Sequence, residues 1–398
     1  MSLDLSVKAQ AVKPSSTLAI TARVKELKSQ GIDVVGFGAG EPDFNTPYNI
    51  NEAAIHAIQE GFTRYTDASG TEELKSAVCR KFKTFNHISY NTDQIVISNG
   101  GKHSLTNVFS ALLSPDDEVI IPAPYWLSYP EIVMLAGGIP VFISANKSQN
   151  YKISAKQIDD ACTEKTKVLI INTPNNPSGM IYTKEELEAI ATVAIKRNIY
   201  VVSDEMYENL VYGDAKHVSI ASLNEEIYKR TITCCGVSKS YAMTGWRIGY
   251  TGSSTEIAKL MGSIQSHQTS NPNTIAQKAA MEALNGSQET VNTMNDEFNR
   301  RREYITDRVR NLPYLDAVTP LGAFYLFVDV SQVLLKYYKG ELVENVQKLI
   351  DILLRDFRVV VIPCEDFGFA DHIRLSYAIS MEQIKKGMDR LEEFLTQL

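Results

Sequence analysis

Polar residues suited to chemistry follow four short apolar runs of this sequence. They are Asn99-Gly100-Gly101-Lys102 after QIVIS (94–98), Asn172 and Asn175-Asn176 after KVLII (167–171), Asp204 and Tyr207 after IYVVS (199–203), and Ser238-Lys239 after TITCC (231–235). Ligands of an open parallel sheet bind at the carboxyl ends of its strands. We therefore expect a glycine-rich helix start, amides, a carboxylate, a phenol and an amine to meet at one edge.

Each of these groups has a defined chemical use. Glycines at a helix N-terminus let backbone N–H groups approach a phosphate. A buried or cation-flanked lysine has a depressed pKa and acts as a nucleophile and base. A lysine that forms a Schiff base, with an Asp facing a pyridinium nitrogen, is the arrangement that pyridoxal phosphate needs. Taken singly, each motif is an ordinary turn, cap or surface residue, so it is their coincidence that indicates a site.

The elements that must position these residues follow an alternating pattern. Helical spacing at 50–58 and 105–113 alternates with continuous apolar runs, which suit strands buried on both faces of a parallel sheet. Thr183 and Glu186 match a capping box at a helix start. The pattern predicts an α/β fold with a large, doubly wound, mostly parallel sheet domain over 47–285. A smaller α+β domain would combine 1–46, with the strand-like VVGFGAG, and 286–398.

Composition limits the classes of function. The chain has 398 residues, 44% of them apolar, and a formal net charge of −7, which argues against a dedicated nucleic-acid binder. The first 16 residues lack the apolar run of a signal peptide, and no run reaches the roughly 20 residues of a membrane span. The cysteines, odd in number, show no metal-ligand spacing. We expect a cytoplasmic protein with reduced thiols, no metal site and no membrane or nucleic-acid partner. The five cysteines are Cys79, Cys162, Cys234, Cys235 and Cys364.

The stretch SKSYAMTGWRIGY (238–250) resembles the cofactor-lysine signature of class I aminotransferases, which have the type I fold of pyridoxal-phosphate enzymes. Further matches, in the family's order, are GAGEPDF (38–44), Tyr65 to Gly70, NTPNNPSG (172–179), SDEMYENL (203–210) and HIRLSYA (372–378). KPSST (13–17) and PYWLSYPE (124–131) are similar to the bacterial aspartate aminotransferases. The resemblance covers essentially the whole chain.

The resemblance implies how the cofactor is held. Lys239 would form the Schiff base and shuttle the proton between substrate and cofactor, and Asp204 would pair with the pyridine nitrogen. Asn176 and Tyr207 would hydrogen-bond the 3-oxygen, and Trp126 would stack on the ring. The residues implied around the phosphate are Gly101, Lys102, Ser238 and Arg247, with Tyr65 from the neighbouring subunit of a homodimer. One departure is Gly236, where many relatives have a hydroxyl residue that touches the phosphate.

The resemblance also implies the substrate contacts. Arg374 would bind the α-carboxylate through both arms of its guanidinium, and Gly40 would bring the backbone close to the same group. Lys102, with Ser16 and Thr17, would bind the distal carboxylate of aspartate or glutamate. The implied reaction moves an amino group from an L-amino acid, aspartate first, to a 2-oxo acid such as 2-oxoglutarate, by a ping-pong mechanism. Relatives that accept prephenate, aromatic amino acids or alanine share most of these motifs.

Other interpretations fit less well. GFGAGEP (36–42) begins like a dinucleotide fingerprint, but its sixth position is Glu41, so a nicotinamide dehydrogenase is not supported. A regulator that borrows this fold usually carries an added DNA-binding domain, for which the chain has no spare length. A β-lyase or a cyclopropane-forming synthase that uses pyridoxal phosphate would need the same lysine, and the fold alone does not separate these enzymes from aminotransferases.

Overall fold

The computed structural model describes residues 5–398, so the first four residues of the predicted polar N-terminal segment lie outside it. At its centre is a seven-stranded sheet with the order β2-β8-β7-β6-β5-β3-β4. In that order the strands are β2 (Ile95–Ser98), β8 (Gly249–Gly252), β7 (Thr231–Gly236), β6 (Tyr200–Asp204), β5 (Thr166–Asn172), β3 (Glu118–Ala123) and β4 (Ile139–Ser144). Six of these strands run in one direction and β8 runs against its two neighbours.

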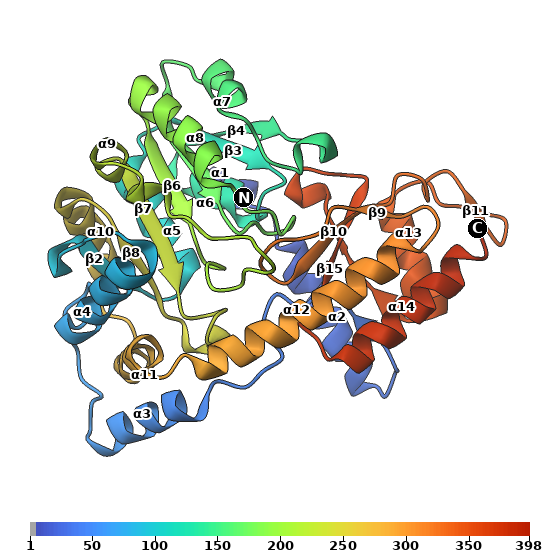
Figure 1. Ribbon diagram of the computed structural model, residues 1–398, viewed down its shortest axis with the longest axis horizontal. Helices are drawn as coiled ribbons and strands as arrows, with labels where there is room; N and C mark the ends of the chain where they lie inside the picture. Colours follow the sequence, from blue (N-terminus) through green and yellow to red (C-terminus); the bar gives the residue numbers. More distant parts are fainter. Residues whose placement is uncertain (1–4) are drawn as a thin grey trace.

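Helices cover both faces of this sheet (Figure 1). They are α4 (Glu72–Lys81), α5 (Gly101–Leu112), α6 (Ser128–Ala136), α7 (Ala155–Ala161), α8 (Lys184–Arg197), α9 (Glu225–Tyr228), α10 (Thr255–Gln268) and α11 (Thr274–Asn285). Helix α3 (Tyr48–Gln59) packs on α11 instead. Along β5, Val168 and Ile170 pack in one apolar cluster with α5, α6 and α10. Leu169 and Ile171 pack in another cluster with α7 and α8. This alternation between two buried faces explains the continuous apolar runs and confirms the predicted doubly wound α/β class.

A second sheet lies in the C-terminal part of the chain. Its order is β14 (Ile362–Pro363), β15 (His372–Ser376), β10 (Tyr325–Asp329) and β9 (Asp316–Ala317), and its strands pair antiparallel. β1 (Val35–Gly36), within the VVGFGAG stretch, pairs with β13 (Val359–Val360). The N-terminal strand therefore folds back onto the C-terminal part of the chain. The remaining elements here are α1 (Val7–Ala11), α2 (Ser16–Ser29), β11 (Tyr337–Tyr338), β12 (Glu341–Leu342), α13 (Val346–Ile352) and α14 (Met381–Leu395).

The long helix α12 (Glu289–Arg310) runs from beneath the central sheet to the C-terminal elements (Figure 1). The capping box before α8 is present, because the Thr183 side chain accepts from the Glu186 backbone and the Glu186 side chain accepts from the Thr183 backbone. No helix within residues 5–398 has both the length and the apolar composition to cross a bilayer.

The strand β8 is the antiparallel member of the mostly parallel sheet that the sequence pattern predicts. Its sequence, GYTG, contains two glycines and lacks the apolar run by which the other strands were predicted. It returns beside β7 after a loop of residues 237–248 and pairs antiparallel with both β7 and β2. Because two reversals cancel, β2 keeps the direction of β7, and the carboxyl ends of both strands lie at the same edge of the sheet.

Candidate functional site

A cavity of about 240 Å³ lies at this edge of the sheet. Of the fourteen site residues implied by the resemblance, Ser16 and Tyr65 are absent from its lining. The predicted residues that line it are Thr17, Gly40, Gly101, Lys102, Trp126, Asn176, Asp204, Tyr207, Ser238, Lys239, Arg247 and Arg374. The carboxyl ends of β2, β5, β6 and β7 thus meet as the sequence pattern indicates, and Arg374 joins them from β15 of the second sheet.

Lys239 lies three residues beyond the end of β7, in the loop before β8. Its Nζ donates to the Gly40 carbonyl oxygen at 2.5 Å. Burial is the main cause that lowers the pKa of this amine to about 8, and the Arg247 and Arg374 charges add to the lowering against the opposing charge of Glu41. Near neutral pH a useful fraction of the amine is therefore unprotonated and nucleophilic.

Asp204 is the last residue of β6 and is buried. Its Oδ2 accepts from the Tyr129 hydroxyl at 2.6 Å, and its Oδ1 accepts from the Met206 backbone N–H at 3.2 Å. Burial raises the pKa of the Asp204 carboxyl, although these two hydrogen bonds act to lower it. Both donors are neutral, so a cation placed against this group would stabilise its charged form.

Tyr207 lies in the turn after β6, and its hydroxyl is 3.0 Å from the hydroxyl of Tyr325 on β10. Burial first, and then the neighbouring Tyr325, raise the pKa of the Tyr207 phenol well above its usual range. The phenol is therefore a neutral hydrogen-bond donor. Asn176 is also buried, and its side-chain oxygen accepts from Nη1 of Arg374 at 2.9 Å.

Arg374 is 2% exposed, which is rare for an arginine. Its guanidinium carbon lies 4.3 Å from the centre of the Tyr325 ring, and Nη2 lies 3.4 Å from the Gly38 carbonyl oxygen. Its Nε has no hydrogen-bond partner within residues 5–398. A buried cation with free N–H groups, facing a cavity, is suited to binding a carboxylate.

The glycine-rich turn after β2 leads directly into α5, whose first residue is Gly101. A Cβ on Gly100 would collide with the Arg247 guanidinium, and a Cβ on Gly101 would collide with the Met206 side chain. Gly100 also has a φ of +92°, which side chains disfavour. The free N–H groups of the first helical turn and the Arg247 charge together favour an anion here.

Lys102 lies in the first turn of α5, with its Nζ 5.1 Å from the centre of the Trp126 ring. Burial lowers the pKa of the Lys102 ammonium, and the nearby Arg247 charge lowers it further. Thr17 lines the same cavity from the start of α2, and its Oγ1 is buried without a partner in the part of the chain that the structure describes. The Ser16 hydroxyl is likewise buried and unpaired within that part, but Ser15, not Ser16, reaches the cavity lining.

Tyr65 and Gly236 differ from the other predicted positions. Tyr65 is 90% exposed and does not line the cavity of its own chain. A Cβ on Gly236 would lie 2.9 Å from Met206 Cε and 3.1 Å from the Ile248 carbonyl oxygen, which is too close for a side chain. The absence of a hydroxyl residue at this position thus has a steric reason, because Met206 and the adjacent strand fill the space.

Among the lining residues that sequence reasoning missed are Ser15, Tyr129, Thr244 and Tyr325. Tyr129 and Tyr325 carry the contacts to Asp204 and Arg374 described above. Tyr129 belongs to the motif PYWLSYPE and Tyr325 to the apolar sequence of β10, so each reads as an ordinary apolar residue of a helix or a strand. A buried tyrosine needs a partner for its hydroxyl. That requirement was the available signal, but it does not identify the partner.

Comparisons with known proteins agree with this geometry. The family model of aminotransferase class I and II matches residues 32–391. An aspartate aminotransferase of Bacillus sp. (strain YM-2) is 49% identical over 98% of this chain and 99% of its own length. A probable aspartate/prephenate aminotransferase of Aquifex aeolicus is 43% identical over the full length of both chains.

Solved structures give the same result. The aspartate aminotransferase of Rhizobium meliloti superposes with a TM-score of 0.96 at 37% identity, covering all of both chains. That of Thermus thermophilus with maleate has a TM-score of 0.94 at 39% identity, covering 99% of this chain and all of that chain. The predicted family and fold type are therefore confirmed, and the chain belongs to the aminotransferase class I and II family.

Proposed function

We propose that this aminotransferase uses pyridoxal 5′-phosphate to move the amino group of L-aspartate to a 2-oxo acid such as 2-oxoglutarate. The observation that carries the proposal is the pairing of Lys239, an amine with a pKa of about 8, with Asp204, a buried carboxyl that has only neutral donors. A nucleophilic amine and a carboxyl that accepts from neutral donors, both at one cavity, match the aldehyde and the basic ring nitrogen of pyridoxal phosphate.

The residues present fit this cofactor. Lys239 would hold the aldehyde carbon and Asp204 the protonated ring nitrogen. Tyr207 and Asn176 would donate to the ring oxygen, and Trp126 would pack against the ring. Bound pyridoxal phosphate supplies an electron sink for the substrate's α-carbon. The residues that would hold the phosphate are the N-terminal turn of α5 with Gly101 and Lys102, Ser238 and Arg247.

The chain's own residues would bind the substrate, move its α-proton and exclude water. Arg374 binds and orients the α-carboxylate through its free N–H groups, beside the backbone of Gly40. Nζ of Lys239 takes the proton from the α-carbon, which its lowered pKa permits near neutral pH. The aromatic rings of Trp126 and Tyr325 exclude water from the reacting atoms. A ping-pong sequence follows, because one site serves the amino donor and then the 2-oxo acid.

Aspartate is proposed because Lys102 lies in the large proposed domain, residues 47–285, while Arg374 lies in the proposed second domain of 1–46 and 286–398. A dicarboxylate would bridge them through its two ends, beside the Thr17 hydroxyl, which has no partner among residues 5–398. The relatives named as aspartate aminotransferases support this choice. Those named as aspartate/prephenate aminotransferases favour prephenate as a second amino acceptor, and aromatic amino acids or alanine remain alternative donors.

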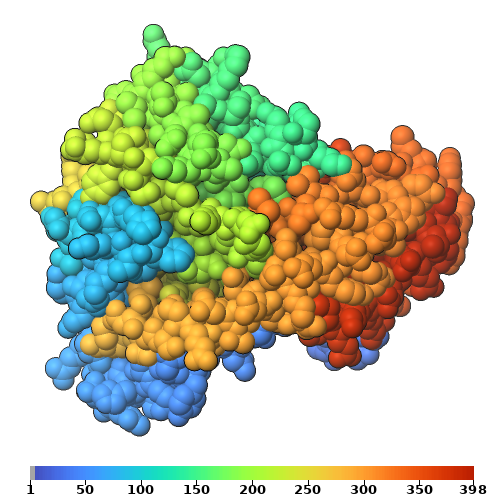
Figure 2. All heavy atoms as spheres, viewed as in Figure 1, coloured from blue at the N-terminus to red at the C-terminus, as the bar shows by residue number. Residues whose placement is uncertain are grey.

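A homodimer is part of the proposal. Tyr65 is 90% exposed although the family motif gives it a phosphate contact, so its phenol would serve the neighbouring subunit's site. Helix α3 forms a protruding lobe at the lower left of the molecule (Figure 2). It carries exposed apolar side chains at Tyr48, Ile55 and Ile58, a pattern that marks an interaction surface. Size-exclusion chromatography with light scattering tests the dimer.

A panel of amino donors against 2-oxoglutarate tests the function. We expect aspartate to give the highest kcat/KM and the purified holoenzyme to be yellow. A protein that binds pyridoxal phosphate but eliminates rather than transfers the amino group would be a lyase, which the release of ammonia detects. A protein that binds no pyridoxal phosphate would contradict the proposal as a whole.

A further inference from the structure

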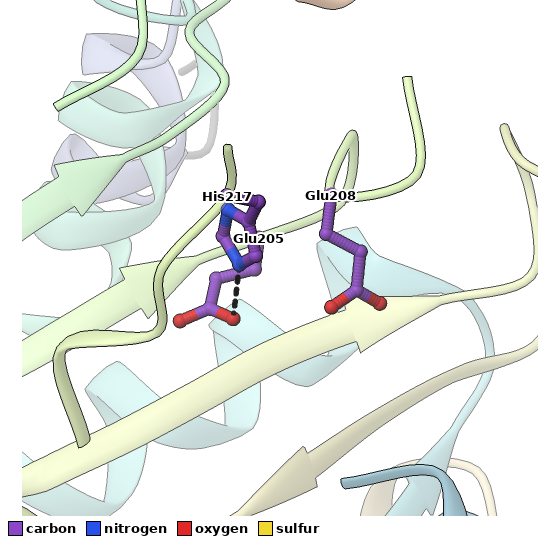
Figure 3. A group of neighbouring side chains, drawn as sticks. All are labelled: Glu205, Glu208 and His217. Carbon is purple, nitrogen blue, oxygen red and sulfur yellow. Dashed lines mark hydrogen bonds and ion pairs between the residues drawn. The ribbon is translucent and has the colours of Figure 1, made fainter. Parts of the chain in front are cut away.

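The segment that carries Asp204 and Tyr207 also carries two buried acids that the proposed mechanism does not use. Glu205 and Glu208 alternate with the site residues along the turn, and their side chains are 0% and 3% exposed. Figure 3 shows Glu205 facing His217, with Glu208 beside the pair. Burying two carboxylates is unfavourable unless a cation and hydrogen bonds compensate them.

Lys81, the last residue of α4, supplies that cation. Its Nζ forms an ion pair with Glu208 and donates to the Asn86 side-chain oxygen at 2.8 Å. Asn86, from the short π-helix η1 (Phe82–Asn86), donates in turn to Glu208 at 2.7 Å and to Glu205 at 3.0 Å. Burial alone lowers the pKa of Lys81, but the neighbouring Cys235 and Glu208 outweigh it and the net shift is upward.

The remaining oxygen contacts of Glu205 are also filled. Ser203 donates to Oε1 at 2.8 Å, and His217 lies 2.9 Å from Oε2, which also accepts from Ser219. Burial raises the pKa of Glu205, but His217 and the hydroxyl donors lower the same pKa by more than burial raises it. The net shift of the Glu205 pKa is therefore downward. The ligand atoms of Glu205, Glu208 and His217 lie within 4.8 Å of one another. A metal ion does not fit among them, because the ammonium and the amide already occupy these oxygens.

The backbone connects this network to the site. The Glu205 N–H donates to the Cys234 carbonyl oxygen at 2.8 Å, and the Glu208 N–H donates to the Glu205 carbonyl oxygen at 3.0 Å. Tyr207 lies between the two acids in sequence. Any displacement of the Glu205 or Glu208 backbone would therefore move the Tyr207 phenol and the Asp204 carboxyl.

We propose that Lys81 and Asn86 are positioning residues, which hold the Asp204–Glu208 turn from behind so that Asp204 and Tyr207 keep their places in the cavity. The inference rests on the proposed function, because it assigns the turn a role toward bound pyridoxal phosphate. Neither Lys81 nor Asn86 lines the cavity, so any effect on the cofactor must pass through the turn.

The test compares two lysines of the same helix. Lys81→Met combined with Glu208→Gln removes both charges, so no buried charge is left unpaired. Lys75→Met is the matched control, because Lys75 is also 9% exposed but its ammonium bonds to Ser69, away from the turn. If the double variant does not fold, Glu208→Gln alone replaces it, since Glu205 still compensates Lys81.

Three readouts follow for each variant. In cofactor-free protein, we expect faster amide hydrogen exchange at residues 205–208 in the Lys81 variant only. With pyridoxal phosphate bound, the midpoint of the pH titration of its absorbance should move by half a unit or more, because the Tyr207 hydrogen bond to the ring oxygen sets it. A misplaced turn should lower kcat about 10-fold or more, with KM for aspartate changed less than about threefold.

The inference would be overturned if the Lys81 variant showed only a lower melting temperature, with unchanged amide hydrogen exchange and an unchanged midpoint of the absorbance titration. The network would then have only a structural role. Equal effects of Lys75→Met would also overturn the inference. If the wild-type protein shows no cofactor absorbance, the proposed function fails, which the cofactor-free exchange measurement distinguishes from failure of the positioning role.

Discussion

Replacing Arg374 by lysine keeps a positive charge but removes the planar fork, and it is the sharpest test of the substrate site. The guanidinium is fixed by Asn176 at 2.9 Å and by its stacking on Tyr325 at 4.3 Å, and its Nε has no partner in the described part of the chain. A lysine ammonium lacks both the stacking surface and the second parallel N–H group. The variant should therefore lose at least one charge-assisted hydrogen bond to the α-carboxylate.

One such bond is worth about 1.5–3 kcal/mol, or roughly 10- to 150-fold in kcat/KM. Every amino acid carries the α-carboxylate, so aspartate, phenylalanine and alanine should lose similar factors. The assay is steady-state transamination to 2-oxoglutarate with each donor, at saturating pyridoxal phosphate. The absorbance of the bound cofactor serves as the control, because Arg374 is assigned to substrate and not to cofactor. A loss below about threefold for all three donors would refute the assignment of the α-carboxylate to Arg374.

The other predictions follow from the same contacts. Lys239→Ala should abolish the covalently held cofactor absorbance and transamination, and near wild-type turnover would contradict the central assignment. Asp204→Ala should lower the single-turnover rate by about 100-fold with little change in melting temperature, whereas a mere strand cap would lose about 1 kcal/mol of stability and keep its turnover. Lys102→Ala should weaken aspartate and glutamate by about 10-fold or more and spare phenylalanine, once cofactor affinity has been measured and corrected for; equal losses would remove Lys102 from specificity. The Lys239 amine has a pKa of about 8 and reacts only when neutral. Uptake of pyridoxal phosphate by the cofactor-free protein should therefore accelerate as pH rises toward 8 and level off above that pH. A rate of uptake that is independent of pH between 6 and 9 would contradict this prediction.

The parts of the fold that were predictable are those specified by local pattern. Lys239, Asp204 and the helix start at Gly101 each follow an apolar strand directly, so chain order alone brought them to one edge of the sheet. Arg374 could be assigned to the site only through the resemblance of HIRLSYA, because its strand belongs to another sheet. Strand β8 could not be predicted from its composition, because it lacks an apolar run. Its Gly249 and Gly252 lie so close to neighbouring backbone and ring atoms that a side chain would not fit.

The contacts that could not be predicted join residues far apart in the chain. The Tyr129 hydroxyl reaches Asp204 across 75 positions, and Tyr207 meets Tyr325 across 118. The buried Lys81 pairs with Glu208 across 127 positions, although lysine before a helix end usually indicates a solvated side chain. Such pairs depend on how the helices pack against the sheet, and this packing cannot be read from the spacing of residue types in the sequence.

The reversed strand β8 has a consequence for engineering this enzyme. The loop of residues 237–248 is joined at both ends to paired strands, by the Gly236–Gly249 register, and it carries both Lys239 and Arg247. Its length is therefore fixed by two anchors, so insertions or deletions in it would shift the amine relative to the anion site. The start of α2, with Ser15 and Thr17, enters the cavity from a helix outside both sheets. Libraries intended to change the amino donor should vary that helix and leave the loop at its native length.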